Sequence, residues 1–251
     1  MDPLISIITV TFNSEKTVER TLRSIASQTY RHIEHIVIDG ASTDGTLSIL
    51  DKYRQGISYF SSEADRGMYD AINKGLRVAK GDVIGLLHSD DLFAHDAVAA
   101  EIAEQFADRE VDGIYGDAVF FSPVSEQKIV RLYSSAKFSS ARLAWGWMPA
   151  HPTLYLRSEL YKELGEFKTD YAIAADYDYV CRIFLRNKFR ILYMPKVLVK
   201  MQTGGISTRS WSATIRLNQE VVRACRENGI RTNMLKVLSK YPEKLVELLS
   251  L

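Results

Sequence analysis

Two adjacent acids, Asp90 and Asp91, follow the apolar residues 83–87 and are the strongest candidates for chemistry in this sequence. Like charges at the end of a buried strand are unfavourable unless a cation or hydrogen-bond donors compensate them. Carboxylate oxygens suit Mg²⁺ or Mn²⁺, which keep several waters while bridging one or two carboxylates to a diphosphate. The pair therefore predicts a divalent-metal site, with a helix N-cap as the alternative explanation. For the adjacent His88 we expect a packed side chain.

Polar residues also follow two earlier apolar stretches, at residues 11–15 and 39–45. The carboxylate of Asp39 is suited to accepting hydrogen bonds from the N–H groups of a nucleotide base. Phe12 offers either a stacking surface or a core contact. Each segment alone is compatible with a turn or a helix cap. Together with residues 88–91 they favour a binding site, because ligands bind beyond the carboxyl ends of parallel strands.

Hydrophobic patterns predict the elements that position these residues. Continuous apolar runs predict buried strands, and apolar residues three or four positions apart predict helices between them. The expected strands of the first half span residues 4–10, 33–38, 57–60 and 83–87, and the expected helices contain residues 18–25, 47–53, 68–79 and 98–106. This alternation predicts βαβ units and an α/β fold with a mostly parallel sheet flanked by helices.

The second half of the sequence is less regular. Antiparallel strands are expected at residues 113–121 and 128–132, a helix at 174–185, and two short strands at 189–194 and 197–201. Beyond Trp211 the pattern is helical to the end, with interruptions near Gly229 and Pro242.

Composition and charge restrict the class of protein. Hydrophobic residues make up 46% and charged residues 25% of the 251 residues, which is typical of a globular protein. Lys and Arg (32) balance Asp and Glu (31), so no nucleic-acid partner is expected. The single cysteines Cys181 and Cys225 disfavour a disulfide framework and favour a reducing cytoplasm. We expect neither a signal peptide nor a membrane-spanning segment.

Four segments together resemble family 2 glycosyltransferases of the GT-A fold. They are residues 7–13 (IITVTFN), 36–46 (IVIDGASTDGT), 63–75 (EADRGMYDAINKG) and 88–91 (HSDD). The third is similar to a segment of bacterial polysaccharide and colanic-acid type members, and the fourth stands where the family has its DXD motif. The resemblance is strong over residues 4–92, fair to about residue 205 and weak beyond. It implies a bacterial enzyme of polysaccharide biosynthesis that uses Mg²⁺ or Mn²⁺.

The resemblance also implies roles for residues of the first half. Asp91 is implied to ligate the metal and Asp90 to contact the ribose or the sugar. Ser89 replaces the first acid of the DXD motif, which leaves Asp91 as the better supported ligand. Asp39 is implied to bond the base, and Arg66 to approach the nucleotide or its phosphates. The implied lining of the nucleotide pocket is completed by Thr11, Phe12, Asn13 and Glu15.

An inverting sugar transfer needs a carboxylate that takes the proton of the acceptor hydroxyl. Asp176 stands at the aspartate of the family's E-D motif, with Ala175 in place of the preceding acid, and is implied to be this base. Read alone, Asp176 and Asp178 are explained as acids that the helix dipole favours at an N-terminus; Asp178 is the second candidate. Trp145 and His151, in a loop punctuated by Gly and Pro, are acceptor-side candidates, with packing as the alternative, and Asp178 is a third candidate on that side.

The expected organisation is a GT-A domain, residues 1–208, followed by a C-terminal helical extension, residues 209–251. Residues 1–92 form its nucleotide-binding half and residues 93–208 its acceptor and catalytic half. The paired glycines in residues 202–207 suit either a loop that closes over the donor or a plain connector. Lys236, Lys240 and Lys244, near apolar residues 245–249, leave open a peripheral contact with the inner face of a membrane, with a solvated face as the alternative. A homodimer is also left open.

We therefore expect a cytoplasmic, inverting glycosyltransferase. It would move a sugar from a nucleotide-diphosphate donor, UDP before GDP, to a hydroxyl of a saccharide or lipid-linked acceptor. A sugar nucleotidyltransferase is one alternative, but residues 11–15 lack the glycines of its phosphate loop. A non-catalytic nucleotide-sugar-binding module is the other, and the intact Asp91 and Asp176 oppose it.

Overall fold

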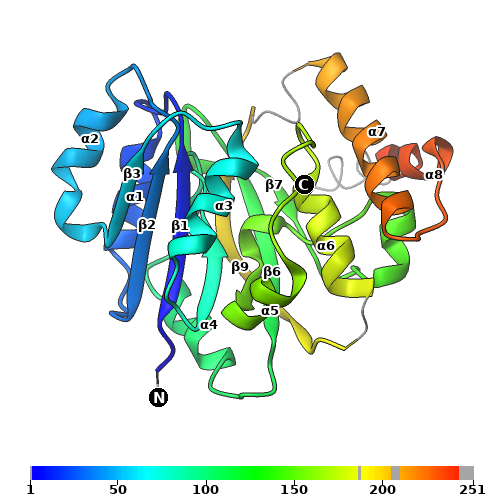
Figure 1. The fold of residues 1–251 in the computed structure, drawn as a ribbon, viewed down its shortest axis with the longest axis horizontal. Helices are drawn as coiled ribbons and strands as arrows, with labels where there is room; N and C mark the ends of the chain where they lie inside the picture. The colour runs from blue at the N-terminus through cyan, green and yellow to red at the C-terminus, as the bar shows by residue number, and fades with distance from the viewer. Residues whose placement is uncertain (1, 186–187, 205–209, 243–251) are drawn as a thin grey trace.

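A nine-stranded mixed sheet lies at the centre of the fold, in the order β3-β2-β1-β4-β8-β6-β9-β5, with β7 paired to β6 (Figure 1). The structure is a computed structural model that describes residues 2–185, 188–204 and 210–242. Within these residues no helix is long and apolar enough to cross a bilayer.

The first half of the sheet is parallel, as the sequence predicts. β1 (Ile5–Thr11) pairs with β2 (Ile33–Asp39) and β4 (Val83–Leu86), and β2 pairs with β3 (Tyr59–Ser62). Every residue of β1 is buried, because both faces of the sheet are covered. The carboxyl ends of β1, β2 and β4 therefore meet at one edge. The helices of this half are α1 (Val18–Ala26), α2 (Thr46–Lys52), α3 (Met68–Val78) and α4 (Val98–Gln105).

An antiparallel strand joins the two halves of the sheet. β8 (Tyr155–Arg157) lies between β4 and β6 (Gly113–Ser122) and is antiparallel to both. β6 is parallel to β9 (Ile191–Gln202) and forms the predicted hairpin with β7 (Ser125–Tyr133), while β5 (Leu92–Phe93) pairs with β9. Six strands therefore run in one direction, and β5, β7 and β8 run in the other.

Some predicted boundaries were wrong. Residues 189–194 and 197–201 belong to one strand, β9, rather than two. Pro195 has no N–H to donate to β6, so the register shifts near it while the strand continues. β3 lies two residues later than predicted, after a 3₁₀ turn (Arg54–Gly56). Helix α5 (Ser158–Leu164) was not predicted.

The C-terminal helices belong to the core of the second half. α6 (Ala175–Leu185) packs against α7 (Trp211–Glu227), and α8 (Met234–Leu238) follows; Figure 1 shows all three side by side at the right. Val221, Ala224 and other apolar residues of α7 are buried in the same cluster as the inner face of α6. The described part of the extension is therefore integral to the second half of the fold.

Two of the three lysines considered for membrane contact, Lys236 and Lys240, are partly or fully buried. Lys240 is 4% exposed, and its Nζ lies 3.5 Å from the carbonyl oxygen of Gly146. The Nζ of Lys236 lies over the ring of Trp145. Lys244 and residues 245–249 lie outside the described residues.

Candidate functional site

The acidic turn after β4 is held in place by the β1–α1 loop and by α1. The N–H of Asp91 donates to the carbonyl oxygen of His88 over 3.0 Å, which closes a four-residue turn. The hydroxyl of Thr21 in α1 donates to the carbonyl oxygen of Asp91 over 2.8 Å. The hydroxyls of Ser14 and Ser89 lie 2.9 Å apart. These contacts fix the backbone of both acids.

The two acids of this turn differ in exposure. Asp91 is 3% exposed, whereas Asp90 is only partly buried. Burial, and then the charge of Asp90, raise the pKa of Asp91 well above the usual range, against a hydrogen bond from the backbone of Gln202. A divalent cation would remove this penalty, so the pair fits a metal site. Asp90 is the more exposed of the two acids, and the assignment of Asp91 as the metal ligand stays a prediction.

Two carboxylates leave most of the coordination sphere of Mg²⁺ or Mn²⁺ to waters and a diphosphate. In keeping with such a partial protein site, no cluster of three His, Cys, Asp or Glu side chains able to hold an ion occurs in the described part of the chain.

Thr11 and Phe12, at the end of β1, have features of a ligand-binding wall. The hydroxyl oxygen of Thr11 is buried and has no hydrogen-bond partner among the described residues, so a polar group of a ligand would satisfy it. Phe12 is 62% exposed, which excludes the core alternative. A Cβ added to Gly40 would lie 3.4 Å from the Phe12 ring and 2.7 Å from a carboxylate oxygen of Asp65. The glycine thus leaves room beside the aromatic ring.

Asn13 and Glu15 join the loops that follow β1 and β2. Asn13 has a φ of 49°, a left-handed conformation that asparagine tolerates. Its Oδ1 accepts a hydrogen bond from the N–H of Thr43 over 2.8 Å. Oε2 of Glu15 accepts from the N–H of Gly45 over 2.8 Å. Both side chains therefore shape the wall of the predicted pocket.

Asp39 lies under the same turn and is fully buried. Its carboxylate accepts hydrogen bonds from the N–H of Ser42 (2.9 Å), the hydroxyl of Ser42 (2.5 Å) and the hydroxyl of Ser62 (2.7 Å). Asp39 thus organises the loop, and its predicted bond to the base stays a prediction. Arg66, predicted to approach the phosphates, is exposed and pairs with Asp70 over 2.9 Å.

Asp176, the second residue of α6, is surrounded by groups from three elements. Its Oδ1 accepts from the N–H of Tyr177 (2.8 Å), and the hydroxyl of Tyr69 in α3 lies 3.5 Å away. Its Oδ2 lies 3.2 Å from Nδ1 of His151, in the 3₁₀ helix His151–Thr153. Burial raises the pKa of Asp176 to about 6. At neutral pH the carboxylate is therefore ionised and more basic than an ordinary aspartate.

Two histidines connect Asp176 with the acidic turn. Nε2 of His88 lies 3.1 Å from Nε2 of His151. Burial lowers the pKa of each imidazole to about 4, so both are neutral at neutral pH. Nδ1–H of His151 then donates to Asp176, and Nε2 of His151 accepts from His88. This chain of hydrogen bonds brings Asp176 and the acidic turn to one site.

The histidine bridge was missed in the sequence. His88 was expected to be packed and His151 to be structural or on the acceptor side, as two unrelated residues. They are 63 positions apart, and no spacing rule connects residues on different elements. Trp145, the other acceptor-side candidate in that loop, is 44% exposed.

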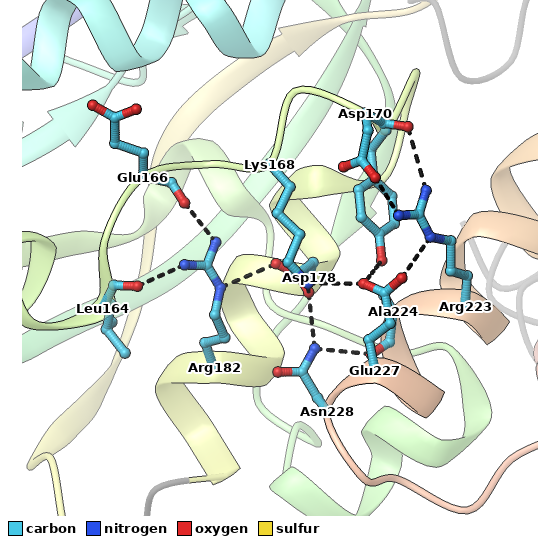
Figure 2. A network of polar contacts seen from close by, with 11 residues as sticks. Leu164, Glu166, Lys168, Asp170, Asp178, Arg182, Arg223, Ala224, Glu227 and Asn228 are labelled. Atoms are coloured by element: carbon cyan, nitrogen blue, oxygen red, sulfur yellow. Dashed lines mark hydrogen bonds and ion pairs between the residues drawn. The ribbon is translucent and has the colours of Figure 1, made fainter.

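Asp178 lies away from this site, in a network between α6 and α7 (Figure 2). Its side chain has no exposed surface and bonds to Nζ of Lys168 (2.8 Å), Nε of Arg182 (3.0 Å) and Nδ2 of Asn228 (2.9 Å). The expectation of an acceptor-side Asp178 does not fit this position. Its carboxylate holds α6 in place.

A recess of about 600 Å³ is lined by residues of α4, β6, β7 and β9 and by Ala94 and His95, and none of the predicted site residues lines it. Lys196 and Glu101, on its wall, form an ion pair of 2.7 Å.

Known sequences similar to this chain are glycosyltransferases. Residues 6–190 match the family described as Glycosyl transferase family 2. An uncharacterized glycosyltransferase of Mycobacterium tuberculosis is 34% identical over 186 residues, which cover 73% of this chain and 70% of that protein. A PGL/p-HBAD biosynthesis glycosyltransferase of Mycobacterium bovis is 29% identical over 210 residues, which cover 82% of this chain and 79% of that protein.

Solved structures share the fold. The mannosyltransferase PcManGT from Pyrobaculum calidifontis, in complex with GDP-Man and Mn²⁺, aligns with a TM-score of 0.67 and 24% identity over 90% of this chain. S. aureus TarS in complex with UDP aligns with a TM-score of 0.64 and 21% identity over 88%. The chain spans 64% of each of those two chains. These likenesses confirm the predicted GT-A fold.

Proposed function

This chain belongs to glycosyl transferase family 2, and we propose that it is an inverting glycosyltransferase with Asp176 as its catalytic base. The donor is a nucleotide-diphosphate sugar, with UDP favoured over GDP, and the acceptor is a hydroxyl of a saccharide or lipid-linked saccharide in the cytoplasm. Solved relatives hold UDP, UDP-GlcNAc and GDP-Man, which supports a donor of this class.

The observation that carries the proposal is the bridge from Asp176 through His151 and His88 to the acidic turn. An inverting transfer requires a base on the side of the sugar opposite the leaving diphosphate. A buried carboxylate with a pKa of about 6 is ionised at neutral pH and takes up a proton more readily than an exposed aspartate. By donating to one oxygen, Nδ1–H of His151 fixes the orientation of the carboxylate.

Asp90 and Asp91 would hold the metal, with Asp90 facing the donor. A divalent cation held by these residues would supply positive charge to stabilise the departing diphosphate. The exposed ring of Phe12 is placed to stack on a base, and the unpaired hydroxyl of Thr11 to bond a polar group of the nucleotide. Asn13, Glu15 and the buried Asp39 then act by holding these loops together.

A thermal-shift measurement with UDP and Mn²⁺ tests donor binding. A ligand at 100 times its Kd stabilises a protein by about 2.7 kcal/mol, which corresponds to a Tm increase of about 5–10 °C for a chain of this size. We expect this shift in the wild-type protein, its loss with a chelator, and its loss in Asp90→Ala. Asp51→Ala, which removes an exposed acid of α2, is the control and should keep the shift. A shift that persists in Asp90→Ala and with chelator contradicts the metal site.

A second assay separates the alternatives. A sugar nucleotidyltransferase releases pyrophosphate from a sugar phosphate and a nucleoside triphosphate, whereas the proposed enzyme releases nucleoside diphosphate from a nucleotide sugar. A binding module does neither.

A further inference from the structure

The backbone just before Asp176 is held by a carboxylate from the C-terminal extension. Three consecutive N–H groups point to Glu220 of α7. Oε1 of Glu220 accepts from Ala172 over 3.0 Å, and Oε2 accepts from Ile173 over 2.8 Å and from Ala174 over 2.9 Å. These amides precede or begin the first turn of α6, where no intrahelical carbonyl is available to them.

The carboxylate of Glu220 is largely buried where it meets these amides. Its side chain is 11% exposed, and its one ion-pair partner among the described residues is Arg216, with Nε at 3.3 Å. A buried carboxylate is stable only when hydrogen bonds compensate for the lost water, and the three amides do so. Hydrogen bonds to a charged acceptor are about twice as strong as neutral ones, so Glu220 strongly restrains the backbone of residues 172–174.

We propose that Glu220 is a positioning residue of the catalytic site, which holds residues 172–174 so that Asp176 meets His151 and Tyr69. The inference rests on the proposed role of Asp176 as the base. Glu220 lies beyond residues 6–190, the part of the chain that matches the family. The C-terminal extension thus completes the catalytic half of this enzyme.

A second acid of the same helix provides a matched control. Glu227 lies seven residues after Glu220, two turns along the same face of α7. It bonds side chains, namely Nζ of Lys168 (2.8 Å) and the hydroxyl of Tyr171 (2.9 Å), as Figure 2 shows for the labelled Lys168. Glu227 therefore attaches α7 to the same segment without touching the amides that precede Asp176.

Glu220 also acts on Asp176 through its charge. The ionisable groups that face Asp176 are His151, the hydroxyl of Tyr69 and, further away, Glu220. Burial is the main cause of the raised pKa of Asp176, and the negative charge of Glu220 raises it further. Removing that charge should therefore lower the pKa of Asp176.

The test compares Glu220→Gln, Glu220→Asp and Glu227→Gln with the wild-type protein. Glutamine has the size of glutamate but no charge. Its NH₂ group is a hydrogen-bond donor and cannot accept a hydrogen bond from the backbone N–H groups. Aspartate keeps the charge but is one methylene too short to reach all three amides. Hydrogen exchange reports on residues 172–174, NMR of ¹³C-labelled aspartate gives the pKa of Asp176, and release of UDP or GDP from UDP-N-acetylglucosamine or GDP-mannose with Mn²⁺ gives kcat and KM.

We expect faster exchange at residues 172–174 in both Glu220 variants and a kcat about 10²-fold lower at unchanged KM, because small misplacements of a catalytic group have effects of this size. The pKa of Asp176 should fall in Glu220→Gln but not in Glu220→Asp. Glu227→Gln should keep the wild-type kcat and pKa even if it unfolds more easily. If Glu220→Gln does not fold, Glu220→Asp provides the same exchange and kcat test.

A wild-type rate of hydrogen exchange at residues 172–174 in both Glu220 variants would overturn the inference. A kcat of the Glu220 variants equal to that of Glu227→Gln would also overturn it. Asp176→Asn separates this failure from that of the proposed function. If Asp176→Asn turns over normally, the base is assigned wrongly. If Asp176→Asn is inactive while the Glu220 variants keep the wild-type kcat, only the positioning role is wrong.

Discussion

Asp176 is distinguished from the other acids of the chain by its surroundings. Burial in the space between α6, α3 and His151 raises its pKa to about 6. A base acts only when ionised, so kcat should be constant above pH 7 and fall about tenfold per pH unit below pH 6. A pH profile of nucleotide release measures this fall in kcat, the acidic limb of the profile. A limb near pH 4, the range of an exposed aspartate, would show that the base is another group or that Asp176 is open to water.

Loss of folding does not explain such a limb. Because the pKa of Asp176 is higher in the folded than in the unfolded protein, its protonation favours the folded state. This contribution is fully present below the unfolded pKa of about 4 and is lost as the pH rises through about 6. Circular dichroism across the same range provides the control.

Helix α6 separates two acids that the helix dipole alone explains equally well and that only the family resemblance distinguished. Asp176 and Asp178 are two residues apart, so they point to different sides of the helix. Asp176 faces His151, and Asp178 faces the network of Lys168 and Arg182 between α6 and α7 (Figure 2). One acid performs the proposed chemistry, and the other holds the helix that carries it.

Arg182→Ala tests this structural role. The variant removes a partner of the buried Asp178 carboxylate and the donors to the carbonyl oxygens of Leu164 and Glu166. Breaking a buried ion pair typically costs about 3 kcal/mol of unfolding free energy. Arg190→Ala, which breaks an exposed pair with Asp108, should cost about 0.5 kcal/mol. Urea denaturation of both variants measures the difference, and equal losses would contradict the assigned role.

Local patterns predicted most elements of the first half because short polar loops separate the apolar strands from the amphipathic helices. They also predicted that the residues after β1, β2 and β4 gather at one edge. They could not predict β5, a two-residue strand, or α5. The link between His88 and His151, and that between Glu220 and residues 172–174, arise only when distant segments pack. Exposure, which separates Asp90 from Asp91, is likewise a property of the folded chain.

At the scale of the whole molecule, the two halves contribute different parts of the proposed reaction. The parallel half supplies the loops for the nucleotide and the acidic turn, and the half beyond β8 supplies α6 with Asp176. The two are joined by the antiparallel β8 and by the histidine bridge. α7 closes the catalytic half from outside the matched family region.

In the proposed reaction Asp176 takes the acceptor proton, at a site where donor binding does not depend on it. Asp176→Asn keeps the shape of the side chain but cannot act as a base at neutral pH. Donor affinity measured by calorimetry with Mn²⁺, together with nucleotide release from the same donor, tests the claim. We predict unchanged affinity and a rate lower by about 10²–10⁴-fold; a wild-type rate in Asp176→Asn would contradict the account.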